Sequence, residues 1–490
     1  MTTGKSVARS AAAELSERLR GRVLRARDVD FARELEGFNS ITEHDPDLIA
    51  LVSGAADVRE AVSFAAARHL PVSVQATGHG PSLPASGGLL ISTRRLRGVS
   101  IDPVARTARV EGGTQWFEVI QAAAKHGLAP LSGSSPLTGV VGYTIGGGLG
   151  LMARRYGYAA DLVTAVEIVT ADGRSHRATA DQDTDLFWAV RGGKGNFGVV
   201  TAIEFRLVPV SRLYGGGLFF AGEASAEVVH AWREWTATVP EELTSSLALL
   251  RMPDIEAIPP FLRGRLTVHV RIAHLGSADD GERLVAPLRT AGPLVVDTLA
   301  DMPYSRSGEI HQDPTEPIPY NERSMMLRVL DEAAVDALLQ LAGPGADCID
   351  LTVELRQLGG AAGRAPEVPN AVGHRDAAFA LSTLSLPDDR PRWWWTAWRR
   401  GARDSATSTS WPAPTPRTSP RAATSRPPSP GWPGSRPWPT RTTSSASTTT
   451  SRHGRRAAES PPGVERRRSA MPPPGQYPAD TPRWKAGRGD

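Results

Sequence analysis

The chain has 490 residues, which is long enough for two or three domains with cores of their own. Its net charge of +4 is unevenly distributed: residues 389–490 carry 19 Lys and Arg against 6 Asp and Glu, which leaves residues 1–388 at −9. Because the basic charge is confined to one unusual segment, nucleic acid is not an expected partner of the folded part.

The single cysteine, Cys348, excludes an intramolecular disulfide, and its apolar neighbours indicate a small buried hydrophobe. Residues 8–21 alternate charges with alanines, as in an amphipathic helix, and lack the apolar core of a signal peptide. No run approaches the roughly 20 apolar residues of a membrane span. We therefore expect a soluble, cytoplasmic protein without a membrane partner, and the sequence leaves its oligomeric state open.

In chain order, a helical lead-in over residues 1–42 is followed by a predicted domain over 43–210, in which short β-rich runs alternate with helical patterns. The clearest elements of this domain are strands at 48–52, 71–75 and 166–170 and a helix at 57–69.

A second predicted domain covers residues 211–388. Long β-rich runs at 266–272 and 350–355 and an alanine-rich helix at 332–341 predict a sheet covered by helices. Both domains mix helices with strands, so the expected fold class is α+β.

Three glycine-rich segments carry the strongest chemical signal: residues 75–80, 133–150 and 191–201. Glycines in the first segment allow backbone N–H groups to approach a pyrophosphate closely. Each segment alone is equally consistent with a plain turn. Neither a P-loop Gly-Lys-Ser/Thr nor a G-x-G-x-x-G that opens a helix after a strand occurs among them.

In their order and spacing, and with Val110-Glu111-Gly112-Gly113 between them, these segments resemble the berberine-bridge-enzyme-like branch of the FAD-linked oxidases. The resemblance covers about residues 43–210. It implies a two-subdomain FAD-binding domain of the PCMH type, shared with vanillyl-alcohol oxidase, followed by a substrate domain of antiparallel sheet covered by helices. The cofactor-binding positions that it implies are His79, Thr77, Gly78, Gly80, Ser135, Gly139, Gly142, Gly146, Gly147 and Val200.

The family's first loop carries a histidine bonded to the flavin 8α-methyl carbon, and His79 stands at that position. A neutral imidazole is nucleophilic, and the linkage raises the flavin's redox potential. Some members add a cysteine bonded to flavin C6, where this chain has Ser135, so the resemblance implies one covalent link through His79. The alternative is an ordinary loop histidine beside noncovalent FAD. The other ten histidines are expected to be structural or on the surface.

Residues 351–361 and 374–379 resemble the berberine-like substrate domain. Gln357 matches a position where some members place a catalytic carboxylate; a glutamine is no base, but its amide can orient substrate or flavin. Strand alternation puts Glu354 on the opposite face, where we expect it to be solvated or paired. No metal ligands are predicted.

Residues 389–490 hold 18 of the 40 prolines and 8 of the 12 tryptophans, an unusual combination because disordered tails avoid aromatic residues. Shifted by one reading frame, residues 438–453 can encode a string that resembles the family's C-terminus. Residues 406–411 can likewise encode Tyr-Val-Asn-Phe-Leu-Ala, which resembles the strand that carries a tyrosine base in many bacterial relatives. We interpret the segment as frameshifted near residues 388–391 and expect it to be disordered. A natural low-complexity tail is the alternative.

The resemblance implies oxidation of a small organic substrate, in which a base takes a proton, hydride passes to flavin N5 and dioxygen reoxidises the flavin. Two alternatives stay open. The first is a dehydrogenase with another electron acceptor, and the second is a catalytically dead flavin-binding product of a frameshifted gene.

Overall fold

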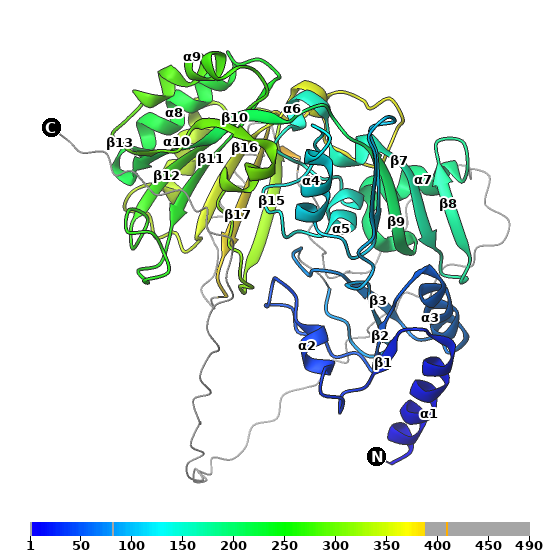
Figure 1. Cartoon of the computed structure of the whole chain (residues 1–490). Helices are drawn as coiled ribbons and strands as arrows, with labels where there is room; N and C mark the ends of the chain where they lie inside the picture. Colours follow the sequence, from blue (N-terminus) through cyan, green and yellow to red (C-terminus); the bar gives the residue numbers. More distant parts are fainter. Residues whose placement is uncertain (1, 81–82, 388–407, 410–490) are drawn as a thin grey trace, which may run out of the picture. The chain divides into compact units, whose positions relative to one another are not determined.

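The computed structural model describes residues 2–80, 83–387 and 408–409, which form three β-sheets with helices packed on them (Figure 1). The frameshift and the disorder expected for residues 389–490 lie outside the described residues, except at two positions. Ser408 and Thr409 form strand β18 (Ser408–Thr409), which pairs with β15 (Asn321–Leu327). At these two positions the structure differs from the expected unstructured tail.

The first sheet has four strands in the order β1-β2-β4-β3, with β1 antiparallel to β2 and the other pairs parallel. The predicted strands at 48–52 and 71–75 and the helix at 57–69 are confirmed, within two residues at their ends. The lead-in expected to be helical also contributes a strand, β1. The elements are β1 (Arg22–Leu24), β2 (Leu48–Leu51), β3 (Val72–Gln75), β4 (Leu89–Ser92), α1 (Thr2–Arg18), α2 (Phe31–Leu35) and α3 (Ala55–Ala67).

The second sheet has five antiparallel strands in the order β5-β6-β9-β7-β8, and the predicted strand at 166–170 lies almost entirely within β7. Buried Trp116 packs edge-on against Tyr143 and Phe205, which holds helices α4 and α5 to this sheet. The elements are β5 (Val99–Asp102), β6 (Thr107–Glu111), β7 (Val163–Val169), β8 (Ser175–Thr179), β9 (Val199–Arg206), α4 (Trp116–Ala124), α5 (Val140–Ile145), α6 (Ala153–Tyr156), η1 (Ala159–Leu162), α7 (Thr184–Gly193) and η2 (Lys194–Phe197).

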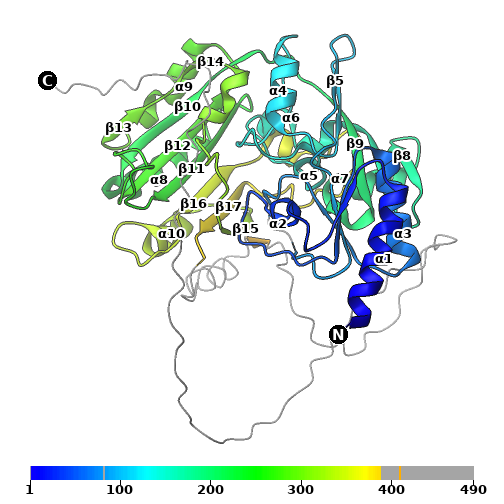
Figure 2. The same ribbon diagram turned by 60° about the horizontal axis from the view of Figure 1, so that its bottom comes forward.

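Within the described residues the third sheet has nine strands, and all of its neighbouring strands are antiparallel. Helices α8, α9 and α10 lie together on one face of it (Figures 1 and 2). This confirms the antiparallel sheet covered by helices. Besides β15 and β18, the elements are β10 (Arg212–Ala221), β11 (Leu243–Arg251), β12 (Leu266–His274), β13 (Leu294–Asp297), β14 (Ala300–Pro303), β16 (Thr352–Gln357), β17 (Phe379–Ser385), α8 (Ser225–Thr236), α9 (Ala278–Arg289), α10 (Glu332–Ala342), η3 (Gly222–Ala224), η4 (Tyr304–Glu309) and η5 (Gly360–Gly363).

The two faces of the third sheet differ in chemistry because successive side chains of a strand alternate between them. On the helix-covered face, Val268 and Val270 of β12 join a core that includes Trp232 and the buried Cys348. The expectation of a buried, unreactive cysteine fits this position, where burial raises the pKa of the thiol. On the opposite face β12 presents polar side chains instead, and the functional site is built there.

None of the helices in the described part of the chain combines the length and the apolar character needed to cross a bilayer.

Candidate functional site

His79 lies in the loop after β3, where its ring stacks on Phe38 with a centroid distance of 3.8 Å and an angle of 11° between the planes. Burial lowers the pKa of His79 to about 4, although a hydrogen bond with the backbone of Leu137 and the charge of Asp313 oppose the shift. The imidazole is therefore uncharged at neutral pH, which leaves it a nucleophilic nitrogen.

Backbone contacts fix the shape of the His79 loop. The carbonyl of Thr77 accepts a hydrogen bond from the Phe38 N–H, and that of Gly78 accepts one from the Asn39 N–H, both at 2.9 Å. Gly78 has a φ of +68°, and a Cβ on it would stand 2.6 Å from the Cα of Gly37. Only glycine satisfies both conditions, so the sequence places this loop directly against residues 37–39.

The second glycine-rich segment meets this loop. The Gly139 N–H donates to the Thr77 hydroxyl at 3.2 Å, and the Leu137 N–H donates to the Ser135 hydroxyl at 3.3 Å. Since the backbone of Leu137 also bonds the His79 ring, His79 and Ser135 share a neighbour. The structure thus brings together residues that the sequence separates by about 60 positions.

A segment that leads into the third sheet holds the same loop from the other side. The Tyr320 hydroxyl donates to the carbonyl of His79. The side-chain amide of buried Asn39 bonds both backbone groups of Tyr320, donating to its carbonyl at 2.9 Å and accepting from its N–H at 3.1 Å. Burial is also the main reason that the pKa of Tyr320 is raised, so its hydroxyl stays protonated as a donor.

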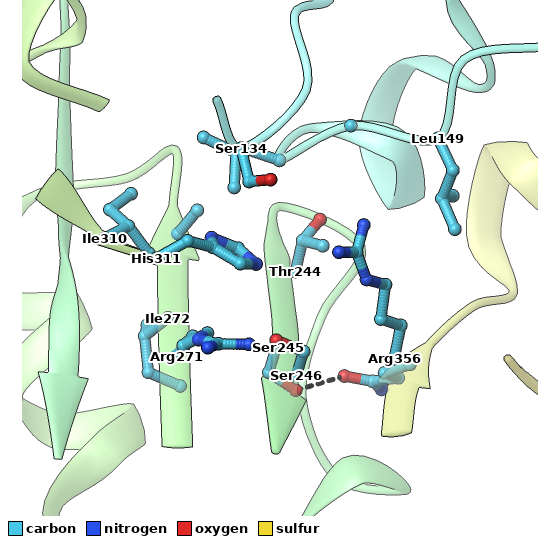
Figure 3. A pocket seen from close by; sticks show the side chains of 14 residues that line it. Ser134, Leu149, Thr244, Ser245, Ser246, Arg271, Ile272, Ile310, His311 and Arg356 are labelled. Carbon is cyan, nitrogen blue, oxygen red and sulfur yellow. Dashed lines mark hydrogen bonds between the residues drawn. The ribbon is translucent and has the colours of Figure 1, made fainter. Parts of the chain in front are cut away.

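A cavity lies between the glycine-rich segment and the polar face of the third sheet. Figure 3 shows His311 and Arg356 extending from opposite sides toward the space beside Ser134. The lining residues are Ser134, Leu149, Gly150, Leu151, Thr244, Ser245, Ser246, Arg271, Ile272, Ala273, Ile310, His311, Arg356 and Gln357.

Glu354 is the centre of a charged cluster at this cavity. Its carboxylate accepts hydrogen bonds from Arg271 Nη1 at 2.7 Å and from Arg356 Nε at 2.8 Å, and His311 Nε2 lies 3.6 Å away. Burial alone would raise the pKa of Glu354, but Arg356, Arg271 and His311 together hold it well below its usual value. Of the two expectations for Glu354, solvated or paired, the structure shows the paired one.

Comparison with known proteins identifies a domain within the first half of the chain. Residues 46–179 match the FAD binding domain model. The (R)-6-hydroxynicotine oxidase of Paenarthrobacter nicotinovorans is 33% identical over 266 residues, which is 53% of this chain and only 56% of that protein. The uncharacterised FAD-linked oxidoreductase YgaK of Bacillus subtilis (strain 168) is 26% identical over 75% of this chain and 81% of its own. Residues 46–179 are an FAD-binding domain.

Solved structures agree at the level of the fold. Xylooligosaccharide oxidase from Myceliophthora thermophila superposes with a TM-score of 0.71 at 19% identity, covering 82% of this chain and 89% of that one. A 6-hydroxy-D-nicotine oxidase from Arthrobacter nicotinovorans superposes with a TM-score of 0.67 at 23% identity. The match covers 80% of this chain and 87% of that one. The expected resemblance to FAD-linked oxidases is confirmed in the FAD-binding domain and in the fold, and FAD is the cofactor.

Two of the predicted cofactor positions have open space beside their backbone. A Cβ on Gly80 or Gly142 would meet no atom within 4 Å, so a ligand can approach the backbone there. Buried hydroxyls of Tyr143 and Thr144, in the same helix as Gly142, have no hydrogen-bond partner among the described residues. These residues fit a bound flavin nucleotide.

Three other predicted cofactor positions have structural roles. Gly147 has a φ of +109°, and a Cβ on Gly146 would stand 3.2 Å from Lys194 Cε. Val200 is buried in β9, and its carbonyl lies 3.0 Å from where a Cβ of Gly112 would be. Their contact with FAD stays a prediction.

Gln357 lies on the face opposite Glu354, as strand alternation predicts. Its amide accepts a hydrogen bond from Ser245 Oγ at 2.9 Å and donates to the Thr236 carbonyl, at the end of α8, at 2.7 Å. Both ends of the amide are therefore engaged on the helix side, while Gln357 also belongs to the cavity lining, and its role in orienting substrate or flavin stays a prediction. The sequence analysis also missed His311, because no motif surrounds it and only the fold places it in the cavity wall.

Proposed function

We propose that this chain oxidises a small organic molecule at an alcohol or amine centre, with FAD as electron acceptor and dioxygen as the reoxidant. The observation that carries the proposal is the cavity between residues 133–150 of the glycine-rich segment and the polar face of the third sheet. A substrate held there lies beside the FAD-binding domain and against hydroxyl, imidazole and guanidinium groups.

We further propose that the flavin is attached through a single bond at His79. Support comes from the neutral state of its imidazole, from its fixed ring on Phe38 and from Ser135, whose hydroxyl cannot form a thioether. When bound, the flavin supplies a two-electron acceptor. The chain's own residues orient the substrate, exclude water and hold the proton that the oxidation releases.

The attachment is tested by precipitating the purified protein with acid and measuring flavin absorbance in the pellet and the supernatant. Yellow flavin in the pellet supports a covalent bond. Flavin released entirely into the supernatant overturns the attachment, while leaving an FAD-dependent activity intact.

The activity is tested without oxygen, by mixing the holoprotein with probe compounds and following the loss of flavin absorbance. The probes are (R)-6-hydroxynicotine and xylobiose, because the oxidases described above act on or bind compounds of these kinds. Air is then admitted and hydrogen peroxide is measured. Reduction with peroxide release supports an oxidase, and reduction without peroxide supports a dehydrogenase. If neither these probes nor a broader set of alcohols and amines reduces bound flavin, the proposal is wrong.

A further inference from the structure

His311 follows η4 and forms part of the cavity wall, with 7% of its side chain exposed. Figure 3 shows its ring extending into the cavity near Thr244. Its two ring nitrogens have different surroundings. Nε2 lies 3.6 Å from the Glu354 carboxylate, whereas Nδ1 is buried and has no hydrogen-bond partner among the described residues.

The nearby carboxylate favours a hydrogen on Nε2, because N–H bonds orient toward negative charge and a lone pair there would be repelled. The neutral ring then keeps its lone pair on Nδ1. The charged and titratable groups around it are Arg271 and His269 from β12, Glu354 and Arg356 from β16, and Asp313 from its own segment.

The charge state of His311 follows from these neighbours. Burial lowers the pKa of His311 and Arg271 lowers it further, whereas Glu354 and Asp313 act in the opposite direction. The net result is a pKa below the usual value, so the imidazole is neutral at pH 7. It can therefore accept a proton, and Glu354 stabilises the imidazolium that results.

We propose that His311 accepts the substrate's proton on Nδ1 during the oxidation, with Glu354 as its positioning residue. This inference rests on the proposed function. The substrate's O–H or N–H bond breaks and its proton passes to Nδ1. The neighbouring C–H bond breaks, and its hydrogen leaves with the electron pair to the FAD. A C=O or C=N bond forms in the substrate, and the proton later leaves His311 for solvent.

Other polar groups of this face are poorer proton acceptors. Both oxygens of Glu354 already accept hydrogen bonds from arginines, which lowers their basicity. His269 stacks on Phe219 at 3.9 Å, and its Nδ1 accepts a hydrogen bond from Arg271 at 3.2 Å. Among these groups, His311 combines a place in the cavity wall with a ring nitrogen, Nδ1, that has no hydrogen-bond partner among the described residues.

The first test needs no substrate. Protein labelled with ¹⁵N in histidine rings is compared by NMR with His311→Gln, whose missing signals identify His311. At pH 7 we expect the ¹⁵N chemical shifts that are typical of a neutral ring with its hydrogen on Nε2. In Glu354→Gln we expect this preference for the Nε2–H tautomer to be lost. An Nδ1–H tautomer or a charged ring at pH 7 overturns the proposal, whatever the protein oxidises.

The second test follows flavin reduction by whichever probe reduces the wild type. Glutamine can replace the N–H toward Glu354 but has no basic lone pair, so His311→Gln should reduce the flavin about 10²- to 10⁴-fold more slowly, with little change in KM. The pH dependence of the rate should also flatten in the variant. His126→Gln, at an exposed site after α4, is the control and should behave as wild type.

A wild-type rate and pH profile in His311→Gln overturn this inference and leave the proposed function standing. If no probe reduces the wild-type flavin, the proposed function fails, and the tautomer measurement alone decides whether His311 is poised as an acceptor.

Discussion

The loop that carries His79 is half-buried and the strand that carries Glu354 is mostly buried, and different parts of the chain shape them. Backbone hydrogen bonds to residues 38 and 39 hold the His79 loop. Gly78 also shapes it, at a position where a side chain would collide with Gly37. Charged side chains shape the Glu354 site instead, since Arg271 lies 83 positions away in the sequence and reaches it through β-sheet register.

The contrast extends to the two histidines. Burial lowers the pKa of both, so both are neutral at pH 7. The ring of His79 stacks on an aromatic ring that fixes its orientation, as the proposed attachment of a flavin requires. His311 instead has a carboxylate beside one nitrogen, which stabilises the ring when it takes up a proton. The neighbours therefore decide which chemistry the same side chain supports.

The largest expected effect comes from removing the attachment residue. His79→Ala should lose all acid-stable flavin, because the variant lacks the imidazole that we propose to form the bond. The measurement is flavin absorbance in the acid pellet, with His311→Gln as a control that keeps covalent flavin. If His79→Ala retained flavin in the pellet, the attachment would be elsewhere.

Breaking the charged cluster should have the next largest effect. Glu354→Ala leaves two arginine charges without their buried partner, which should lower the free energy of unfolding by about 3–5 kcal/mol. Glu167→Ala is the matched control, since its pair with Arg109 at 2.7 Å is partly exposed, and such pairs contribute about 1 kcal/mol or less. Urea denaturation measures both. Equal losses would show that burial does not distinguish the two pairs.

The pH dependence of stability tests the same carboxylate without removing it. Because the folded pKa of Glu354 lies below the unfolded value of about 4.3, its stabilisation is present above that value and is lost as the pH falls through the folded pKa. The difference in unfolding midpoint between wild type and Glu354→Gln should therefore shrink below about pH 4.3. A difference that stays constant down to pH 3 would contradict the lowered pKa.

The sequence predicts the flavin side well because its information is local. Gly78 and Gly142 stand where backbone needs a positive φ or open space, and such needs leave a glycine pattern in the chain. The substrate side leaves no pattern of that kind. Glu354, Arg271 and His311 meet only once the strand register is known, and Gln357, chosen by its distance from a glycine pair, has its amide on the helix-covered face.

The His79 loop has its own test in Gly78→Ala. With a φ of +68° and the Cα of Gly37 close by, an added methyl group should cost about 1–3 kcal/mol and reduce flavin loading. Gly80→Ala meets no atom within 4 Å in the protein, so the stability of its flavin-free form should stay near that of wild type. Thermal unfolding of the flavin-free proteins checks this. A Gly80→Ala variant as unstable as Gly78→Ala would mean that the close approach to Gly37 is not the cause.

The smallest expected effect concerns the contact that joins the two regions. Tyr320→Phe removes the hydroxyl that donates to the His79 carbonyl, and it should lower the free energy of unfolding by about 1 kcal/mol. Since that carbonyl belongs to the attachment residue, flavin should also become covalently bound more slowly when FAD is added to flavin-free protein. Tyr304→Phe is the control, because its buried hydroxyl bonds Ser132 and Pro130, whose contacts do not include the His79 loop. Equal attachment rates in wild type and Tyr320→Phe would show that residues 37–39 and the Thr77–Gly139 contact hold His79 in place without the third sheet.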